Sequence, residues 1–130
     1  MAMLNSNGNV ELVSAGHGPT FLFHANDKSI EPFGGDGLPL AVMQDAEYGP
    51  SRLFDMHPGD ILVLLTDGVI ETQNPAGKLL GSDAVARLIA DSATSPAREI
   101  VKILKDAAAS HSGGSPQADD VTICVIKKSD

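Results

Sequence analysis

Acidic residues stand at the ends of two apolar segments in this chain of 130 residues. Asp67 follows the apolar run at residues 61–65 after a single threonine, and Asp119 and Asp120 come directly before the apolar run that begins at Val121. A carboxylate at the end of a buried strand is held more rigidly than one on a loop. Two or three such carboxylates that converge would bind a hard divalent cation such as Mg²⁺ or Mn²⁺. Spacing alone does not show that the two strand ends meet.

Each of these acidic sites also has a plainer interpretation. Asp67-Gly68 between apolar segments is a strong signal for a β-hairpin, because both turn positions accept positive φ readily. Asp119 and Asp120 also fit the description of solvated turn residues before a strand. For Asp67 and for Asp119-Asp120, the residue pattern does not decide between a metal ligand and an ordinary turn residue.

The histidines offer little further chemistry. In the segment "AGHGP", residues 15–19, the residue before Gly16-His17 is Ala15 and not an acid, so we interpret Gly16 and His17 as parts of a structural loop. The other three histidines are scattered and lack the spacing of a zinc site. The sequence has neither a strained serine-nucleophile turn nor a Walker-type phosphate loop.

Composition and charge narrow the class of protein. With 42% hydrophobic and 20% charged residues in 130, the sequence predicts one folded domain over residues 1–130. The net charge of -8 and the lack of a basic cluster argue against nucleic-acid binding. No apolar run reaches the ~20 residues of a membrane span, and the first residues lack the pattern of a secretory signal. The single cysteine, Cys124, fits a reducing compartment, so we predict a cytoplasmic protein.

Hydrophobic periodicity predicts strands first and helices later. Strands are expected over residues 10–15, 20–25 and 29–33, then a Gly-rich loop with a short strand before residue 43, an edge strand that stops at Pro58-Gly59, and a strand at 61–65 covered on both faces. One helix is predicted from Ser82, and a second one with Ser95 as N-cap and Pro96 as its first residue. The second helix should end near residues 111–116, before a final strand. This order predicts an α+β domain built on a mostly antiparallel sheet.

Four segments together resemble a known family. "AGHGP", "GGDGLPLAV", "PGDILVLLTDGVIETQNPAGKLLG" and "ADDVTICVI" occur here in the order found in the PPM family of metal-dependent protein serine/threonine phosphatases. The sequence is most similar to the bacterial SpoIIE/RsbU-like branch, from about Val10 to the end. "LLTDGVIE" and "DDVT" with two predicted helices between them form a specific signal, whereas either segment alone would be weak.

The resemblance implies an antiparallel β-sandwich flanked by helices, with a binuclear Mn²⁺ or Mg²⁺ centre at one end. It implies that Asp67 and Asp119 are metal ligands and catalytic residues, and that Asp67 is also the hairpin residue that presents the ligand. Gly68 would let the backbone turn tightly beside the metal. Asp120 would order the site or hydrogen-bond a metal-bound water.

One motif of the family is missing. The family places a further aspartate, in a "DxxGHG" element, before all the segments above, and this sequence has no aspartate before Asp27. The resemblance therefore implies an incomplete domain that lacks the N-terminal strands and helices. Loss of that ligand should remove most of the metal affinity.

Two hypotheses follow from this combination. The first is a phosphatase that removes phosphate from phosphoserine on an anti-anti-sigma-factor-like protein in bacterial signalling, with an upstream sensor or receiver domain in the parent protein. The second is a catalytically silent half-domain, or truncated form, that acts as an interaction module. An open sheet edge would then allow a homodimer.

Overall fold

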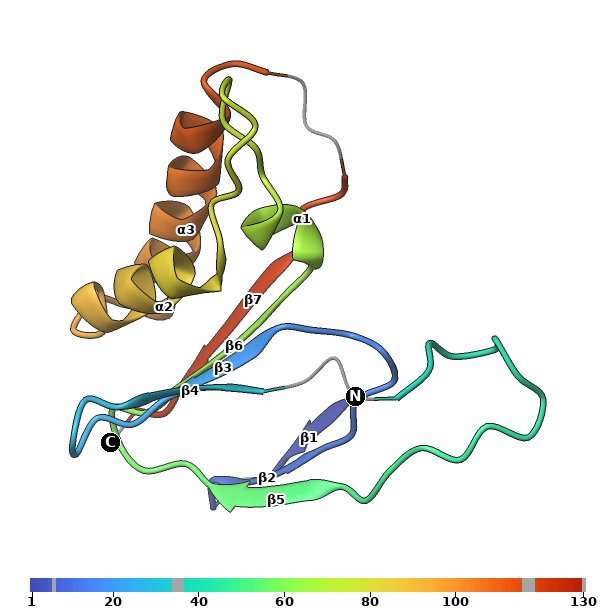
Figure 1. The fold of residues 1–130 in the computed structure, drawn as a ribbon. Helices are drawn as coiled ribbons and strands as arrows, with labels where there is room; N and C mark the ends of the chain where they lie inside the picture. The colour runs from blue at the N-terminus through green and yellow to red at the C-terminus, as the bar shows by residue number, and fades with distance from the viewer. Residues whose placement is uncertain (6, 34–36, 116–118, 130) are drawn as a thin grey trace.

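The computed structural model describes residues 1–5, 7–33, 37–115 and 119–129. Within these residues it contains strands and helices in the order drawn in Figure 1. The elements are β1 (Ala2–Leu4), β2 (Asn9–Leu12), β3 (Thr20–Phe23), β4 (Ile30–Phe33), β5 (Arg52–Asp55), β6 (Ile61–Leu65), α1 (Asp67–Ile70), α2 (Ser82–Asp91), α3 (Ala97–Ser112) and β7 (Ile123–Lys127).

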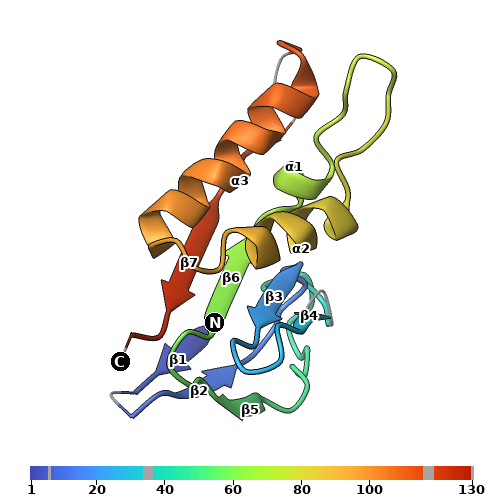
Figure 2. The same cartoon turned by 90° about the vertical axis from the view of Figure 1, so that its left-hand side faces the viewer.

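The strands form two antiparallel sheets. Sheet A has the order β1-β2-β5, and sheet B has the order β4-β3-β6-β7. The sheets face each other across a buried cluster of Val10 and Met56 with Leu22 and Leu62. Figures 1 and 2 show α2 and α3 on the side of sheet B that faces away from sheet A. The predicted α+β sandwich of antiparallel sheets with flanking helices is confirmed.

The central strand of sheet B is β6, and its burial follows from its position. It pairs with β3 on one side and with β7 on the other, so both of its edges are hydrogen-bonded. Because side chains alternate along a strand, Ile61, Val63 and Leu65 face the helices while Leu62 faces sheet A. The prediction of a strand covered on both faces is confirmed.

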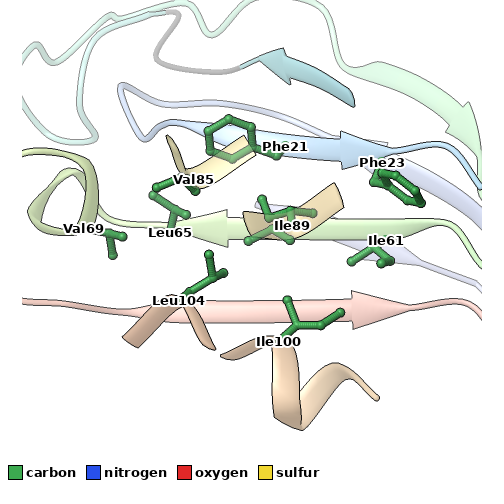
Figure 3. Close-up of a cluster of buried hydrophobic side chains, with 10 residues drawn as sticks. Phe21, Phe23, Ile61, Leu65, Val69, Val85, Ile89, Ile100 and Leu104 are labelled. Carbon is green, nitrogen blue, oxygen red and sulfur yellow. The ribbon is translucent and has the colours of Figure 1, made fainter. Parts of the chain in front are cut away.

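Helices α2 and α3 cover the outer face of sheet B with apolar stripes. Val85 and Ile89 of α2, and Ile100 and Leu104 of α3, are fully buried against the sheet (Figure 3). Their i, i+4 spacing places each pair on one helix face. Helix α3 ends at Gly113, which adopts the left-handed conformation that closes many helices.

Three local predictions were wrong or missed. The N-cap of α3 is Pro96, one residue later than predicted, and the helix begins at Ala97. No strand occupies residues 37–51, because Val42 N–H bonds back to Pro39 O and Ala41 has φ +67°, which closes a turn there. Strand β1 was not predicted. The first part of the predicted Gly-rich loop, residues 34–36, lies outside the described residues.

Candidate functional site

The end of β6 and the beginning of β7 lie side by side. These strands pair in antiparallel register, with Leu65 opposite Ile123. Beyond this pair, Thr66 N–H donates to Thr122 O at 3.1 Å. The Thr66 hydroxyl donates to Asp120 O at 2.8 Å and accepts from Thr122 N–H at 2.9 Å. Asp67 and the Asp119-Asp120 pair are therefore held at the same end of sheet B.

Asp67 does not lie in a hairpin, and that prediction was wrong. Thr66 takes the N-cap position with extended backbone, and Asp67 is the first residue of the short helix α1. Val69 is completely buried in the core between sheet B and the helices. Burial of Val69 requires the chain to turn inward as a helix, and a type I′ hairpin would instead carry it away along a new strand.

Gly68 is needed for a different reason from the one predicted. Gly68 lies in α1, and its φ is not positive. A Cβ at this position would lie 2.6 Å from Asp120 O and 3.4 Å from Asp119 O. Real Cβ atoms do not approach a carbonyl oxygen so closely, so only glycine lets α1 pack against the segment that leads into β7.

The carboxylates at this end are exposed and locally hydrogen-bonded. Asp67 Oδ1 accepts from Gly68 N–H at 3.0 Å, and Asp119 Oδ1 accepts from Asp120 N–H at 2.7 Å. Asp67, Asp119 and Asp120 are all exposed, so solvent reaches their side chains. The carbonyl oxygen of Asp120 accepts a hydrogen bond from the Thr66 hydroxyl, and this bond joins the two strand ends. The predicted site residues are thus brought to one end of the sheet, while their roles stay predictions.

The acids in the described part of the chain do not by themselves make a complete divalent-cation site. Among residues 1–5, 7–33, 37–115 and 119–129, no three His, Cys, Asp or Glu side chains are grouped so that they could hold a metal ion. A divalent cation of the Mg²⁺ or Ca²⁺ type takes six or more oxygen ligands, several of them waters. Asp67 and Asp119 fit such a site chemically but do not complete it.

The "AGHGP" loop lies at the same end of sheet B. It leads into Thr20, which pairs with Leu64 near the end of β6. Gly16 has φ +70°, and a Cβ there would lie 2.8 Å from Pro39 N. His17 is exposed, and its carbonyl oxygen accepts from the Ser14 hydroxyl at 3.0 Å. Gly16 thus packs closely on Pro39, and the structural role of this loop stays a prediction.

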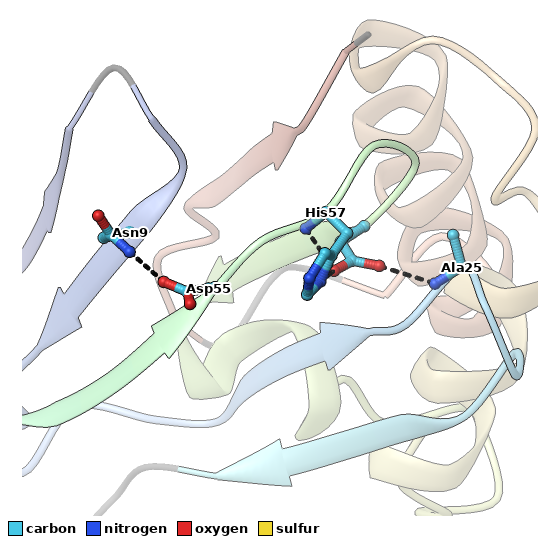
Figure 4. Close-up of polar contacts among 5 residues, drawn as sticks. Asn9, Ala25, Asp55 and His57 are labelled. Carbon is cyan, nitrogen blue, oxygen red and sulfur yellow. Dashed lines mark hydrogen bonds and ion pairs between the residues drawn. The ribbon is translucent and has the colours of Figure 1, made fainter.

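Sequence reasoning missed two residues that hold the ends of β6, one beside the site and one at the far end. Thr66 joins the two strand ends through its hydroxyl, and its place directly before Asp67 was the only available signal. At the opposite end of β6, Asp60 is 2% exposed and accepts the N–H groups of Ala25 and His57, both at 2.8 Å (Figure 4). Asp60 thus anchors β6 where it begins.

Comparison with known proteins agrees with the fold and the motifs. The sequence model of the family described as Stage II sporulation protein E (SpoIIE) matches residues 2–129, which is almost the whole chain. The chain belongs to the SpoIIE family. The recognition of a SpoIIE/RsbU-like phosphatase domain from the sequence is therefore confirmed.

Three relatives show how far the similarity extends. "Phosphoserine phosphatase RsbU" of Bacillus subtilis (strain 168) is 37% identical over 95 residues, which are 72% of this chain and 27% of that protein. The RsbU and RsbW domains of Rv1364c from Mycobacterium tuberculosis match with 27% identity and a TM-score of 0.71 over 98% of this chain and 35% of that chain. The manganese-presoaked phosphatase domain of SpoIIE from Bacillus subtilis has 14% identity and a TM-score of 0.73, over 99% of this chain and 55% of that chain.

The chain thus spans about a quarter of RsbU and just over half of the solved SpoIIE phosphatase domain. None of the helices in the described part of the chain has the length and apolarity that crossing a bilayer requires.

Proposed function

We propose that this chain forms part of a metal-dependent protein serine/threonine phosphatase that acts on phosphoserine in a small regulatory protein of the anti-anti-sigma-factor kind. The observation that carries the proposal is the Thr66 junction, which holds Asp67 and Asp119 at one end of sheet B. Family membership supports the same conclusion, as does the similarity to RsbU, a phosphoserine phosphatase.

Asp67 and Asp119 would hold Mn²⁺ or Mg²⁺ between β6 and β7. Divalent cations bound there would supply positive charge to the phosphoryl oxygens and lower the pKa of a bound water. The chain has a net charge of -8 and carries no basic cluster, so its own side chains supply little positive charge for a phosphate. Thr66 would fix the spacing between the two carboxylates, and Gly68 would allow the close approach that this spacing needs.

The remaining ligands would come from polypeptide outside these 130 residues. The sequence has no aspartate before Asp27, so the "DxxGHG" aspartate of the family has no counterpart in it. Two exposed carboxylates alone bind a divalent cation weakly, because each missing ligand must be replaced by water. We therefore propose that the isolated chain is catalytically silent and that the parent protein is the active phosphatase.

Substitution in the parent protein tests the role of Asp67. Asp67→Asn keeps the size of the side chain and the acceptor oxygen for Gly68 N–H, but removes the negative charge. We expect Mn²⁺-dependent phosphate release from a phosphoserine protein to fall by at least about 100-fold, roughly 2.7 kcal/mol in the activation free energy. Asp45→Asn, at an exposed acid in the loop before β5, is the matched control and should leave turnover unchanged. Unchanged turnover of the Asp67→Asn variant would refute the assignment.

The isolated chain separates the two hypotheses about activity. We expect no hydrolysis of p-nitrophenyl phosphate above background when Mn²⁺ is added to the 130-residue chain. Clear metal-dependent hydrolysis that Asp67→Asn abolishes would show that the chain is itself an active phosphatase, and the interaction-module hypothesis would then be wrong.

The proposal also covers the location, regulation and oligomeric state of the parent protein. We propose a cytoplasmic protein in which an upstream sensor or receiver domain regulates the phosphatase. A homodimer could form through an open sheet edge, which in the described residues is β1 or β5 of sheet A and β4 or β7 of sheet B. Light scattering that gives only the monomer mass over a wide concentration range would count against this dimer.

A further inference from the structure

The connection between α1 and α2, residues 71–81, forms a hydrogen-bonded arm. Leu80 N–H donates to Thr72 O, and Asn74 N–H donates to Lys78 O, both at 2.9 Å. The side chain of Asn74 adds a further bond, because its Oδ1 accepts from Lys78 N–H at 2.9 Å. The two halves of the arm are therefore joined to each other along its length.

The base of the arm is bound to the helix that carries Asp67. The Thr72 hydroxyl donates to Gly68 O at 2.8 Å, and at the other end of the arm Gly81 N–H donates to Ile70 O at 2.9 Å. Both carbonyl groups belong to α1, so α1 and the arm form one hydrogen-bonded unit. This matters because α1 has only 4 residues, and a helix so short gains little stability from its own hydrogen bonds.

The tip of the arm contacts the C-terminal end of α3 (Figure 1). His111 Nε2 lies 2.8 Å from Lys78 O, so the imidazole with its proton on this nitrogen donates to that carbonyl. A Cβ at Gly113 would lie 3.0 Å from Cγ of Pro75, which shows how closely the tip approaches the end of α3. Helix α3 is itself packed on sheet B through its buried apolar stripe. The arm thus ties α1 to a firmly packed part of the fold.

The hydrogen bond from His111 joins two segments that are each closed without it. Lys78 O already accepts from Asn74 N–H at 2.9 Å, so the turn at the tip of the arm does not depend on the imidazole. The end of α3 does not depend on it either, since Gly113 N–H donates to Ser110 O at 3.3 Å and Gly113 takes the left-handed conformation. The contribution of the His111 side chain is therefore the attachment of the arm to α3.

We propose that His111 is a positioning residue that, through the arm, fixes the orientation of α1 and of the Asp67 carboxylate. Asp67 is exposed, and its Oδ1 accepts from Gly68 N–H at 3.0 Å within α1, so the carboxylate moves with this helix. The inference rests on the proposed function, in which Asp67 and Asp119 share a divalent cation. A cation site loses affinity when a ligand must first be reoriented, because that ordering opposes binding.

Two substitutions at His111 separate its hydrogen bond from its bulk. His111→Leu keeps a large side chain that cannot donate, whereas the amide of His111→Gln can donate to Lys78 O. Ser110→Leu is the matched control, because Ser110 is exposed in the same turn of α3. In the ¹⁵N-labelled chain without metal, we expect His111→Leu to shift the amide signals of Gly68 and Thr72. His111→Gln should return both signals to their parent positions, and Ser110→Leu should leave them unchanged.

The same variants of the parent protein test the link to the cation. We expect His111→Leu to raise the Mn²⁺ concentration that gives half-maximal turnover of a phosphoserine protein by about three- to tenfold. Turnover at saturating Mn²⁺ should fall by less, because excess cation compensates for a misplaced ligand. His111→Gln should restore the parent requirement for Mn²⁺, and Ser110→Leu should keep it.

Three results would overturn the proposal. They are unmoved Gly68 and Thr72 signals in His111→Leu, equal effects of His111→Leu and His111→Gln, and an unchanged Mn²⁺ requirement in His111→Leu. The last of these would mean that the arm contact serves the fold alone. Unchanged turnover of Asp67→Asn, by contrast, would refute the proposed function, and the amide signals of the metal-free chain would still decide whether His111 orients α1.

Discussion

The two ends of β6 carry aspartates in opposite environments. Asp60, before the strand, is 2% exposed and receives two backbone N–H groups from separate parts of the chain. Asp67, after the strand, is exposed and accepts from the N–H of its own neighbour, Gly68. A buried carboxylate is tolerated only when its oxygens accept hydrogen bonds, so Asp60 stabilises the fold. An exposed carboxylate beside a second acidic strand end is available to bind a cation.

The difference separates stability from function along a single strand. Changes at the Asp60 end should lower the free energy of unfolding, because they leave partly buried donors without partners. Changes of charge at the Asp67 end should leave the free energy of unfolding nearly intact and, under the proposed function, weaken cation binding. The junction residues Thr66 and Gly68 lie between these extremes, because they hold the exposed acids by packing and hydrogen bonds.

The largest effect is expected for Asp60→Ala. This substitution leaves the partly buried N–H groups of Ala25 and His57 without their acceptor, and an unsatisfied buried group costs about 1–3 kcal/mol. We expect the free energy of unfolding to fall by about 2–4 kcal/mol, measured by urea denaturation. Asp60→Asn, which keeps one acceptor oxygen, should lose less. A variant Asp60→Ala as stable as the parent chain would show that the two ends of β6 do not differ in this way.

Gly68→Ala should be the next most damaging change. The new Cβ would lie 2.6 Å from Asp120 O, so α1 or the segment before β7 must shift. Overpacking of this kind costs about 1–3 kcal/mol. The control is Gly49→Ala, because nothing lies within 4 Å of a Cβ at Gly49. Thermal unfolding of both variants measures the difference, and equal midpoints would mean that the close approach at Gly68 relaxes without cost.

Thr66→Val tests the hydroxyl that joins the strand ends. Valine keeps the shape of threonine but cannot donate to Asp120 O or accept from Thr122 N–H. We expect a loss of about 1–2 kcal/mol, because two hydrogen bonds at a partly exposed site are replaced in part by water. Thr94→Val, at an exposed threonine between α2 and α3, should change the free energy of unfolding by less than about 0.5 kcal/mol. Hydrogen exchange of Thr122 N–H should rise in Thr66→Val, and unchanged protection would argue against the junction.

Asp67→Asn should hardly affect stability. The side chain is exposed, and an asparagine Oδ1 can still accept from Gly68 N–H. We expect the free energy of unfolding to stay within about 0.5 kcal/mol of the parent value. A large loss in urea denaturation would show that Asp67 serves the fold as Asp60 does, and the contrast between the two ends would disappear.

The smallest effect concerns Asp27 in the turn between β3 and β4. Hydrogen bonds from the hydroxyl and the N–H of Ser29 lower the pKa of Asp27 below its usual value of 3.8. A lowered pKa in the folded state means that the contribution to stability is present above the unfolded-state pKa and is lost as the pH falls through the folded-state pKa. NMR titration of the side-chain carboxyl carbon should give a midpoint below 3.8. A midpoint at or above that value would contradict the Ser29 contacts.

Much of the fold followed from local patterns in the sequence. The five apolar residues of β6 predicted a doubly covered strand, and Ser95-Pro96 predicted the start of α3 to within one residue. Local signals failed where tertiary packing decided the conformation. Asp67-Gly68 has the sequence of a hairpin turn, but burial of Val69 pulls the chain into α1. Strand β1 forms by pairing with β2, and residues 2–4 contain no short pattern that predicts this pairing.

The sequence suggested residues for the candidate site but not how they are arranged in space. Carboxylates at two strand ends, together with the family motifs, pointed to Asp67 and Asp119. The contact between those ends depends on the register of β6 and β7 and on the hydroxyl of Thr66, and neither can be read from spacing along the chain. Asp60 was not predicted because its partners are main-chain N–H groups, which no residue type in the sequence indicates.

Paramagnetic relaxation by Mn²⁺ in the ¹⁵N-labelled chain tests the central claim most directly. If Asp67 and Asp119 share a cation, Mn²⁺ should broaden the amide signals of Gly68 and Asp120 together, and either Asp67→Asn or Asp119→Asn should weaken the broadening at both positions. Broadening at Asp120 that persists unchanged in Asp67→Asn, or broadening confined to other acidic parts of the surface, would contradict a shared site.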